Sequence, residues 1–259
     1  MKSLVYTIAF DDGPIPYHRW MAMMLISSLQ RSGYTGKVLL FTNSEAQPFR
    51  HGRCEVEQVR LELSDSSPAN AAYRMKYLVA RELPAGYDRY LFADCDCLFL
   101  RNPEEILRSS AELLYAEEPW SEITGSQNNA YLTDYEMRKL DRRGINSGTF
   151  ALDAVSLPNF MEAWKLTDER PPLRQKRYHD QPAFIRTVLD WPGEAQRFCE
   201  PFAVRYPDCE TMRTQDLLQA GLLHFCGIGT AKKLQRMLGY YVMLYGESLA
   251  PFLFEMMQG

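Results

Sequence analysis

The stretch "YLFADCDCLFLRNPEEI", residues 90–106, decides how this chain is expected to fold. It begins with an apolar run that delivers the chain to Asp94 and Asp96, which lie two residues apart. On an extended backbone, residues at this spacing share one side, whereas Cys95 and Cys97 face the other way. Two carboxylates this close repel each other, and a cation between them most readily keeps both ionised. The stretch therefore predicts a divalent metal site at the end of a buried strand.

The backbone at this pair is expected to bend. In a straight strand the two side chains would lie ~7 Å apart, at a rise of ~3.3 Å per residue. That separation is too large for both carboxylates to bind one ion directly. We therefore expect either a bend at Asp94–Asp96 or a ligand that acts through water.

Strands and helices alternate on the N-terminal side of this stretch. Residues 4–10, "LVYTIAF", and 37–43, "KVLLFTN", have the composition of buried strands, and residues 17–33 between them carry apolar side chains at helical spacing. A strand, a helix and a strand within about forty residues are typical of a right-handed crossover in a parallel sheet. A second helix is predicted at 67–84. The predicted fold class is α/β, with a mostly parallel central sheet flanked by helices.

The C-terminal half begins with a polar segment. Residues 117–144 are predominantly polar, and such long insertions in compact domains are usually functional or disordered. Residues 145–153 predict a further strand, 159–166 and 180–190 predict helices, and 221–246 predict a short strand, a Gly-rich turn and a helix. The chain contains no repeat and no linker-like segment. We therefore expect a single domain over residues 1–259.

Composition excludes several classes of protein. Lys and Arg number 29 against 33 Asp and Glu, a net charge of −4, so no overall basic field attracts nucleic acid. The first apolar run is too short for a signal peptide, and no run of ~18 apolar residues predicts a membrane span. The six cysteines include no C-x-x-C pair, which argues against a thiolate zinc site. We expect a soluble, cytoplasmic protein with reduced, mostly buried thiols.

A second acidic pair, Asp11 and Asp12, follows the first predicted strand in "AFDDGP". This short motif resembles the opening of metal-dependent sugar deacetylases, which complete their metal site with two histidines at H-x-x-x-H spacing. The four histidines of the chain are at positions 18, 51, 179 and 224, and no two have that spacing. The deacetylase interpretation therefore lacks its metal, and the pair reads as a turn at the end of a strand.

Five segments together resemble one enzyme family. Residues 90–106 resemble the aspartate-any-aspartate segment of GT-A-fold glycosyltransferases, which hold Mn²⁺ or Mg²⁺ against the diphosphate of a nucleotide sugar. Four further segments resemble motifs of glycosyltransferase family 8, the glycogenin-like and bacterial lipopolysaccharide galactosyltransferase group, and occur in the family's order: "AYRMKYLVARELP" (72–84), "INSGTFALD" (145–153), "YHDQPAFI" (178–185) and "LLHFCGIGTAKK" (222–233). The resemblance implies a GT-A, Rossmann-like fold. It also implies a nucleotide-binding half at 1–116 and an acceptor-binding and C-terminal part at 117–259.

The resemblance implies a set of metal ligands. Asp94, Asp96 and His224 would bind the metal, with Asp94 also near the ribose. A lone histidine on an apolar strand is usually a satisfied core residue, and only its coincidence with the aspartate pair favours the ligand role. Mixed carboxylate and imidazole ligation favours Mn²⁺ over Mg²⁺.

The resemblance also implies how the donor is bound. The end of the first strand, at Phe10, Asp11 and Asp12, would lie beside the uracil and ribose. Arg74 and Lys76 would offset the charges of phosphates and aspartates. Because those two residues are two apart on a helix, they cannot both face one point, and one of them is expected to be solvated.

The phosphate-binding segment departs from the family pattern. The family's diphosphate-binding lysine lies six residues after the histidine, where this chain has Thr230. Lys232 and Lys233 come later, and Lys232 is the expected phosphate ligand. Backbone N–H groups around Gly227 and Gly229 would contribute an anion-binding nest.

Three polar residues are implied around the donor sugar and acceptor: Asn146, Asp180 and Gln181. None of them is expected to be a covalent nucleophile. Asp180 precedes a predicted helix and would serve equally well as its N-cap. Asn146 lies before Gly148, where it would otherwise shape a bulge.

The predicted function is that of a metal-dependent hexosyltransferase in polysaccharide biosynthesis. It would transfer a sugar, with retention of configuration, from a UDP-sugar to a glycan or lipid-linked acceptor. One alternative is a GT-A protein that binds a nucleotide sugar without transferring it. Another is a phosphatase, although Leu98 stands where that motif carries Thr or Val. The C-terminal helix either packs on the core or makes weak peripheral contact with a membrane.

Overall fold

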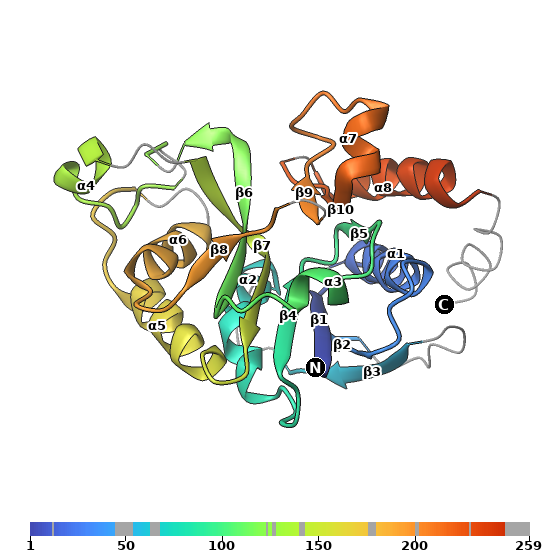
Figure 1. Cartoon of the computed structure of the whole chain (residues 1–259), viewed down its shortest axis with the longest axis horizontal. Helices are drawn as coiled ribbons and strands as arrows, with labels where there is room; N and C mark the ends of the chain where they lie inside the picture. The colour runs from blue at the N-terminus through green and yellow to red at the C-terminus, as the bar shows by residue number, and fades with distance from the viewer. Residues whose placement is uncertain are drawn as a thin grey trace.

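The computed structural model of the protein describes residues 1–11, 13–44, 54–62, 68–122, 124–125, 128–139, 143–175, 180–199, 202–227 and 229–246, with backbone alone at 68–72 and 139. A seven-stranded sheet forms its centre, in the order β3-β2-β1-β4-β7-β6-β8 (Figure 1). Its strands are β1 (Ser3–Ala9), β2 (Lys37–Thr42), β3 (Glu55–Arg60), β4 (Arg89–Ala93), β6 (Leu113–Glu122), β7 (Arg143–Asp153) and β8 (Ala195–Arg197). Strands β3, β2, β1 and β4 are parallel, β7 runs antiparallel to both β4 and β6, and β8 is parallel to β6.

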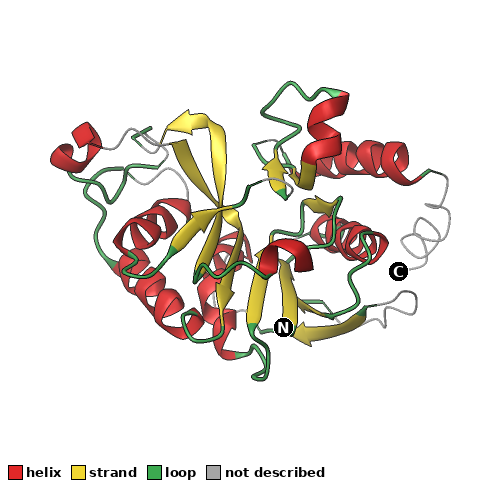
Figure 2. Ribbon diagram, viewed as in Figure 1, coloured by secondary structure: helices red, strands yellow, loops and turns green. Residues whose placement is uncertain are grey.

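Helices cover both faces of this sheet (Figures 1 and 2). One face packs against α1 (Tyr17–Arg31), which is backed by α8 (Thr230–Tyr245); the other packs against α2 (Pro68–Leu78), α5 (Leu157–Glu169) and α6 (Gln181–Asp190). The side chains of β1 alternate between the two cores, because Val5 and Ala9 belong to the first and Leu4, Tyr6 and Ile8 to the second. A strand buried on both faces is typical of a parallel sheet between two helical layers.

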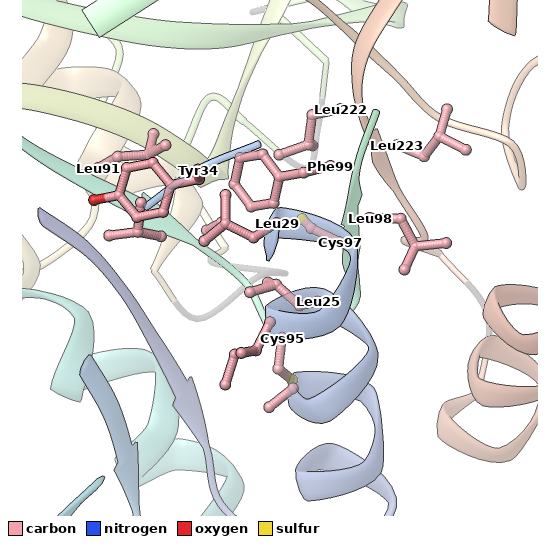
Figure 3. Close-up of a cluster of buried hydrophobic side chains, with 14 of the residues drawn as sticks. Leu25, Leu29, Tyr34, Leu91, Cys95, Cys97, Leu98, Phe99, Leu222 and Leu223 are labelled. Carbon is pink, nitrogen blue, oxygen red and sulfur yellow. The ribbon is translucent and has the colours of Figure 1, made fainter. Parts of the chain in front are cut away.

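A second, three-stranded sheet joins the segment that follows β4 to strands near the C-terminus. It consists of β5 (Cys97–Phe99), β10 (Ala220–His224) and β9 (Ala203–Arg205), with β10 in the middle. Strand β10 pairs antiparallel with β5 and parallel with β9. Figure 3 shows Leu29 of α1 beside Phe99, with Leu25 and Leu222 in the same buried cluster. This cluster fixes the small sheet against α1.

The observed architecture confirms the predicted fold class. The first strand, helix and strand, the helix before β4 and the final strand and helix all lie where the sequence predicts them. The polar segment 117–144 differs from the expectation, because it begins inside β6 and contains a helix, α4 (Asp134–Lys139). Short elements with many polar residues were not predicted at all: β3, β8, β9 and α7 (Thr214–Gln219). Their burial is only partial, so they lack the apolar pattern that would reveal them. The remaining elements are η1 (Val79–Arg81) and α3 (Glu104–Leu107).

The C-terminal helix α8 packs on the core through its aromatic stripe. Met237 and Tyr241 are fully buried, and the Tyr241 hydroxyl lies 2.6 Å from Ser27 Oγ and accepts from Arg31 Nε at 3.0 Å. Of the helices that the structure describes, none has the length and apolar content needed to cross a bilayer.

The cysteines are all free thiols. Cys95 and Cys97 are buried, Cys199 is exposed, and the other three are partly exposed. The expectation that most of the thiols are buried is therefore wrong, since only two of the six are.

Ser28 links α1 to β5 by a buried hydrogen bond, and its removal gives the first prediction. The hydroxyl donates to Leu25 O at 2.7 Å and accepts from Phe99 N at 2.9 Å. Ser28→Ala leaves the Phe99 N–H buried without that acceptor and is expected to lower the free energy of unfolding by about 1–3 kcal/mol in urea titrations. Ser32→Ala is the matched control, because its hydroxyl donates only to Leu29 O in its own helix, and a loss under about 0.5 kcal/mol is expected. Equal losses would contradict this role for Ser28.

Candidate functional site

A cleft of about 190 Å³ opens beyond the carboxyl end of β4. This is where open α/β sheets bind their ligands. The side chains around it come from β6, β7, the start of α6, the end of β10, α2 and α8. The structure brings eight of the predicted site residues to this cleft: Lys76, Asp94, Asp96, Asn146, Asp180, Gln181, His224 and Gly227.

The aspartate pair lies on a turn rather than on a straight strand. Strand β4 ends at Ala93 and β5 begins at Cys97, so the backbone turns at residues 94–96, as the spacing of the carboxylates requires. The turn is tied to its surroundings by two backbone hydrogen bonds. Asp94 N donates to Gly148 O at 2.7 Å, and Phe225 N donates to Asp96 O at 2.9 Å. The bend anticipated from the sequence is therefore present.

His224 reaches the aspartates through strand pairing. It lies directly opposite Cys97 in the antiparallel pair of β5 and β10. Its Nε2 atom is 3.2 Å from Asp96 Oδ1 and 3.8 Å from Asp94 Oδ2. The imidazole is 3% exposed, so it is held inside the protein beside both carboxylates.

Two lysines compensate the acidic charge. Lys76 of α2 is buried, and its Nζ lies 3.1 Å from Asp94 Oδ1 and 3.0 Å from Asp180 Oδ2. Lys233 of α8 donates from Nζ to Asp96 Oδ2 at 2.6 Å. Asp94, Asp96 and Asp180 therefore each have an ammonium partner, which offsets the cost of burying them.

The pKa values reflect this competition between burial and pairing. Burial raises the pKa of the Asp94 carboxyl above its ordinary value, although Lys76 opposes the rise. Burial also disfavours the charged form of Asp96, but Lys233 and His224 outweigh it and hold the pKa of that carboxyl below its usual range. Burial likewise works against both ammonium groups, yet their carboxylate partners keep the lysine pKa values above the ordinary one. Asp96 is therefore an anion and both lysines are cations at neutral pH.

The residues present fit a metal ion. Ligand atoms of Asp96, Cys97 and His224 lie within 4.8 Å of one another, and Asp96 Oδ1 and His224 Nδ1 are buried without a hydrogen-bond partner. Buried polar atoms are normally satisfied, so Asp96 Oδ1, which faces His224 Nε2 at 3.2 Å, is available to an ion held between the two side chains. The other ring nitrogen, Nδ1, is available to a separate ligand or water. Burial raises the pKa of the Cys97 thiol well above its usual value, which keeps the sulfur protonated and a poor ligand. Carboxylate oxygen and imidazole nitrogen therefore remain as the donors, a set that suits Mn²⁺.

The opposite side of the cleft carries hydroxyl, carboxylate and amide groups. Asp180 Oδ2 accepts from Ser147 Oγ at 2.9 Å as well as pairing with Lys76. Asp180 is the N-cap residue of α6 but makes no side-chain cap hydrogen bond, so its carboxylate serves the cleft rather than the helix. Asn146 Oδ1 accepts from Gly148 N at 2.8 Å, and Asn146 Nδ2 lies 3.4 Å from Gln181 Oε1. All three predicted sugar-side residues are thus neighbours.

The end of β1 lies outside the residues that line the cleft. Phe10 is buried in the core, at 4% exposure. The Asp11 carboxylate accepts from the first-turn amides of α1, at 2.8 Å from His18 N and 3.3 Å from Arg19 N. Asp12 lies outside the described residues. The nucleoside-binding role of this segment stays a prediction.

Helices α2 and α8 each carry two nearby cationic side chains, of which one faces the cleft and the other faces away. On α2, Lys76 points into the cleft while Arg74 is exposed, so only one of the two meets the aspartates, as expected. On α8, Lys233 lines the cleft, whereas Lys232, the expected phosphate ligand, is exposed and does not. Gly227 lines the cleft with a left-handed backbone, at φ +83°.

Several residues of the cleft were not singled out from the sequence: Tyr73, Glu118, Trp120, Ser147, Cys209 and Cys226. Glu118 is the acidic residue among these six, and it is buried, at 6% exposure. Its signal was the alternation in "AEEPW", where Glu118 and Trp120 share one face of a strand. That signal was obscured because the whole segment is polar.

Comparisons with known proteins identify the fold. No protein-family model matches the chain, and no curated protein matches its sequence. The structure is similar to galactosyltransferase LgtC in complex with donor and acceptor sugar analogues, with TM-score 0.59, 12% identity, and coverage of 93% of this chain and 96% of that one. An active-site mutant of LgtC, with glutamate in place of a glutamine, matches with TM-score 0.60 and 9% identity over 92% and 95% of the two chains. A glycosyltransferase involved in the glycosylation of the major capsid of PBCV-1 matches with TM-score 0.55 and 14% identity over 92% and 100%. The chain therefore has the GT-A fold of these glycosyltransferases, as predicted.

Gly148 permits the close approach of the acidic turn and the histidine. A Cβ atom at this position would overlap His224 Cε1 and lie 2.5 Å from Asp94 Oδ2. Gly148→Ala is therefore expected to weaken Mn²⁺ binding at least ~10-fold in calorimetric titrations, because the ligands must move apart. Gly239→Ala on α8 is the control, since its Cβ meets nothing within 4 Å and the substitution stabilises a helix by up to ~1 kcal/mol. Unchanged Mn²⁺ affinity in Gly148→Ala would exclude a metal at this position.

Proposed function

We propose that this protein is a metal-dependent glycosyltransferase that moves a hexose from a UDP-sugar to a hydroxyl of a glycan or lipid-linked acceptor, with retention of configuration. The observation that supports this most strongly is the convergence of Asp94, Asp96 and His224 at the end of β4, on a GT-A fold. An imidazole, two carboxylates and two paired ammonium groups together suit a divalent ion and the diphosphate that it binds.

The metal would be held by Asp96 and His224, with Asp94 beside them. When bound, the ion stabilises the negative charge that develops on the leaving diphosphate. Lys233 is placed to accompany it, because its ammonium group lies at Asp96 and at the N-terminal turn of α8, where positive charge favours phosphate. Lys76 keeps Asp94 and Asp180 in fixed positions from the other side.

The donor sugar would lie against Asp180, Gln181 and Asn146. These residues line the cleft next to the aspartate turn, within reach of a sugar attached to a metal-bound diphosphate. The solved LgtC mutant replaces a glutamine of that enzyme's active site by glutamate, and Gln181 is the glutamine that lines this cleft. We assign Gln181 and Asn146 to the sugar and Asp180 to a sugar hydroxyl.

The acceptor would enter beside β6. Trp120 lines the cleft and is 40% exposed, and its ring packs edge-on against Tyr206 at 4.5 Å between centroids. A fixed aromatic ring with one open face offers an amphipathic platform for a sugar. In this assignment the acceptor lies on residues 117–259, whereas the donor is bound by both parts of the chain, with Asp94 and Asp96 from the first and His224 and Lys233 from the second.

Nucleotide binding that depends on the metal is the next prediction. In a melting-temperature screen, UDP with Mn²⁺ is expected to stabilise the protein more than UDP or Mn²⁺ alone. A ligand at a hundred times its dissociation constant stabilises by ~2.7 kcal/mol, or roughly 5–10 °C for a chain of this size. Asp96→Ala is expected to abolish the shift. The same shift in wild type and variant would remove Asp96 from the metal site.

Release of UDP distinguishes an enzyme from a protein that only binds nucleotide sugars. Steady release of UDP from a UDP-sugar in the presence of Mn²⁺, increased by a glycan acceptor, is expected of an enzyme. A protein that shows the melting shift but releases no UDP from any UDP-hexose is a binder of nucleotide sugars, and the transferase proposal then fails.

Neighbouring lysines of α8 provide an internal comparison. Lys233→Ala is expected to weaken UDP binding in the presence of Mn²⁺ at least ~10-fold, since it removes a charge-assisted contact to phosphate. Lys232→Ala, one residue away and exposed, is expected to change it less than ~2-fold. Calorimetry with UDP measures both. If Lys232→Ala has the larger effect, the phosphates lie outside the cleft that the structure shows.

A further inference from the structure

Glu118 is a buried carboxylate in the cleft that neither the metal site nor the lysines use. It lies on β6 and is 6% exposed. Three neutral groups donate to it: Ser121 Oγ at 2.6 Å to Oε2, and Asn146 Nδ2 at 2.9 Å and Gln181 Nε2 at 3.1 Å, both to Oε1. Because Glu118 accepts from the side-chain amides of Asn146 and Gln181, it restricts the orientation of each amide.

The amide of Gln181 is held at both of its hydrogens. Its Nε2 atom donates to Glu118 Oε1 and also to Asn128 Oδ1, at 2.9 Å. Asn128 is fully buried, and its own Nδ2 donates to the backbone carbonyl of Glu122 at 3.0 Å. A carboxylate and a backbone carbonyl can only accept, so neither amide can be rotated by 180° without placing oxygen against oxygen. The orientation of Gln181 is therefore set by its partners.

The same logic applies to Asn146. Its Nδ2 donates to Glu118 Oε1, while its Oδ1 accepts from Gly148 N at 2.8 Å. Because one end faces an acceptor and the other a donor, this amide also has a single favourable orientation. What remains for the cleft is the carbonyl oxygen of Gln181, whose contact with Asn146 Nδ2 is long, at 3.4 Å.

We propose that Glu118, together with Asn128, is a positioning residue that holds Gln181 with its carbonyl oxygen, and not its NH₂ group, toward the bound sugar. This inference rests on the proposed function. Departure of a sugar from its leaving group develops positive charge at the anomeric carbon and ring oxygen. A fixed amide oxygen stabilises that charge without reorganising, whereas an NH₂ group in its place would repel it. Glu118 thus acts on the reaction through Gln181, without touching the substrate.

The first test compares substitutions at two adjacent acids. Glu118→Leu removes the acceptor and is expected to lower kcat for UDP-sugar turnover at least ~10-fold, with the Kd for UDP and Mn²⁺ changed less than ~3-fold. Glu118→Gln is expected to recover activity to within ~3-fold of wild type, because its amide oxygen still accepts from both neighbours. Glu117→Leu is the matched control: Glu117 lies on the other face of β6 and pairs with Arg197 at 3.1 Å, so activity should change less than ~2-fold.

A double-mutant cycle distinguishes positioning from a general loss of structure. If Glu118 acts through Gln181, then Glu118→Leu lowers kcat in wild type but adds less than ~2-fold to the loss in Gln181→Ala. Multiplicative losses in the double variant, or wild-type kcat in Glu118→Leu, would overturn the proposal.

A spectroscopic measurement tests the unmodified protein, so it does not depend on whether any Glu118 variant folds. In protein labelled with ¹⁵N-glutamine, the side-chain NH₂ signals that disappear in Gln181→Ala belong to Gln181. Their hydrogen exchange with water is expected to be at least ~10-fold slower than that of the exposed glutamines, because both hydrogens are bonded inside the protein. Exchange at the rate of an exposed glutamine would overturn the inference.

Failure of this inference is distinguishable from failure of the proposed function. If wild-type protein releases no UDP and shows no melting shift with UDP and Mn²⁺, the proposed function is wrong, and the inference fails with it even if the amide is protected. If wild type is active but Glu118→Leu matches it, only the role of Glu118 is wrong.

Discussion

The antiparallel pairing of β5 with β10 is the constraint on which the site depends. It places His224 opposite Cys97, one residue beyond the turn that carries Asp94 and Asp96. Three potential ligands from segments about 130 residues apart in sequence therefore meet. The strands are short, but they are supported by the buried cluster against α1 that Figure 3 shows. A site built on paired strands keeps its ligands in place before anything binds.

Charge balance is the second requirement, and helices supply it. Lys76 arrives from α2 on one side of the sheet and Lys233 from α8 on the other. Each lysine pairs with buried carboxylates. Without a cationic partner, burial would favour the protonated form of these carboxylates or their exposure to solvent. The polar side of the cleft follows a different rule, because Glu118 is satisfied by neutral amides and a hydroxyl. The cleft thus has a charged half suited to phosphate and metal and a hydrogen-bonded half suited to a sugar.

Local sequence predicted the parts of this arrangement that local physics determines. The acidic turn followed from two carboxylates after an apolar strand, and one of the two cations on α2 had to face away because of helix geometry. The sequence analysis favoured Lys232, whereas Lys233 lines the cleft. One residue rotates a helix by about 100°, and the start of α8 depends on its packing, so local sequence does not determine which lysine faces inward. It could not decide whether Asp180 caps α6 or enters the cleft, since both require the same residue at the same position. Glu118 was missed because its two amide partners lie on other elements, β7 and α6, and its own strand looks like a polar loop.

The most direct test of the central claim is the position of a bound metal. Crystals of the protein grown with UDP and Mn²⁺ would be measured at the manganese absorption edge. We expect one strong anomalous peak within coordination distance of Asp96 and His224, ~2.0–2.3 Å from their oxygen and nitrogen atoms. A peak at any other place, or UDP bound in this cleft with no peak between those two side chains, would contradict this expectation.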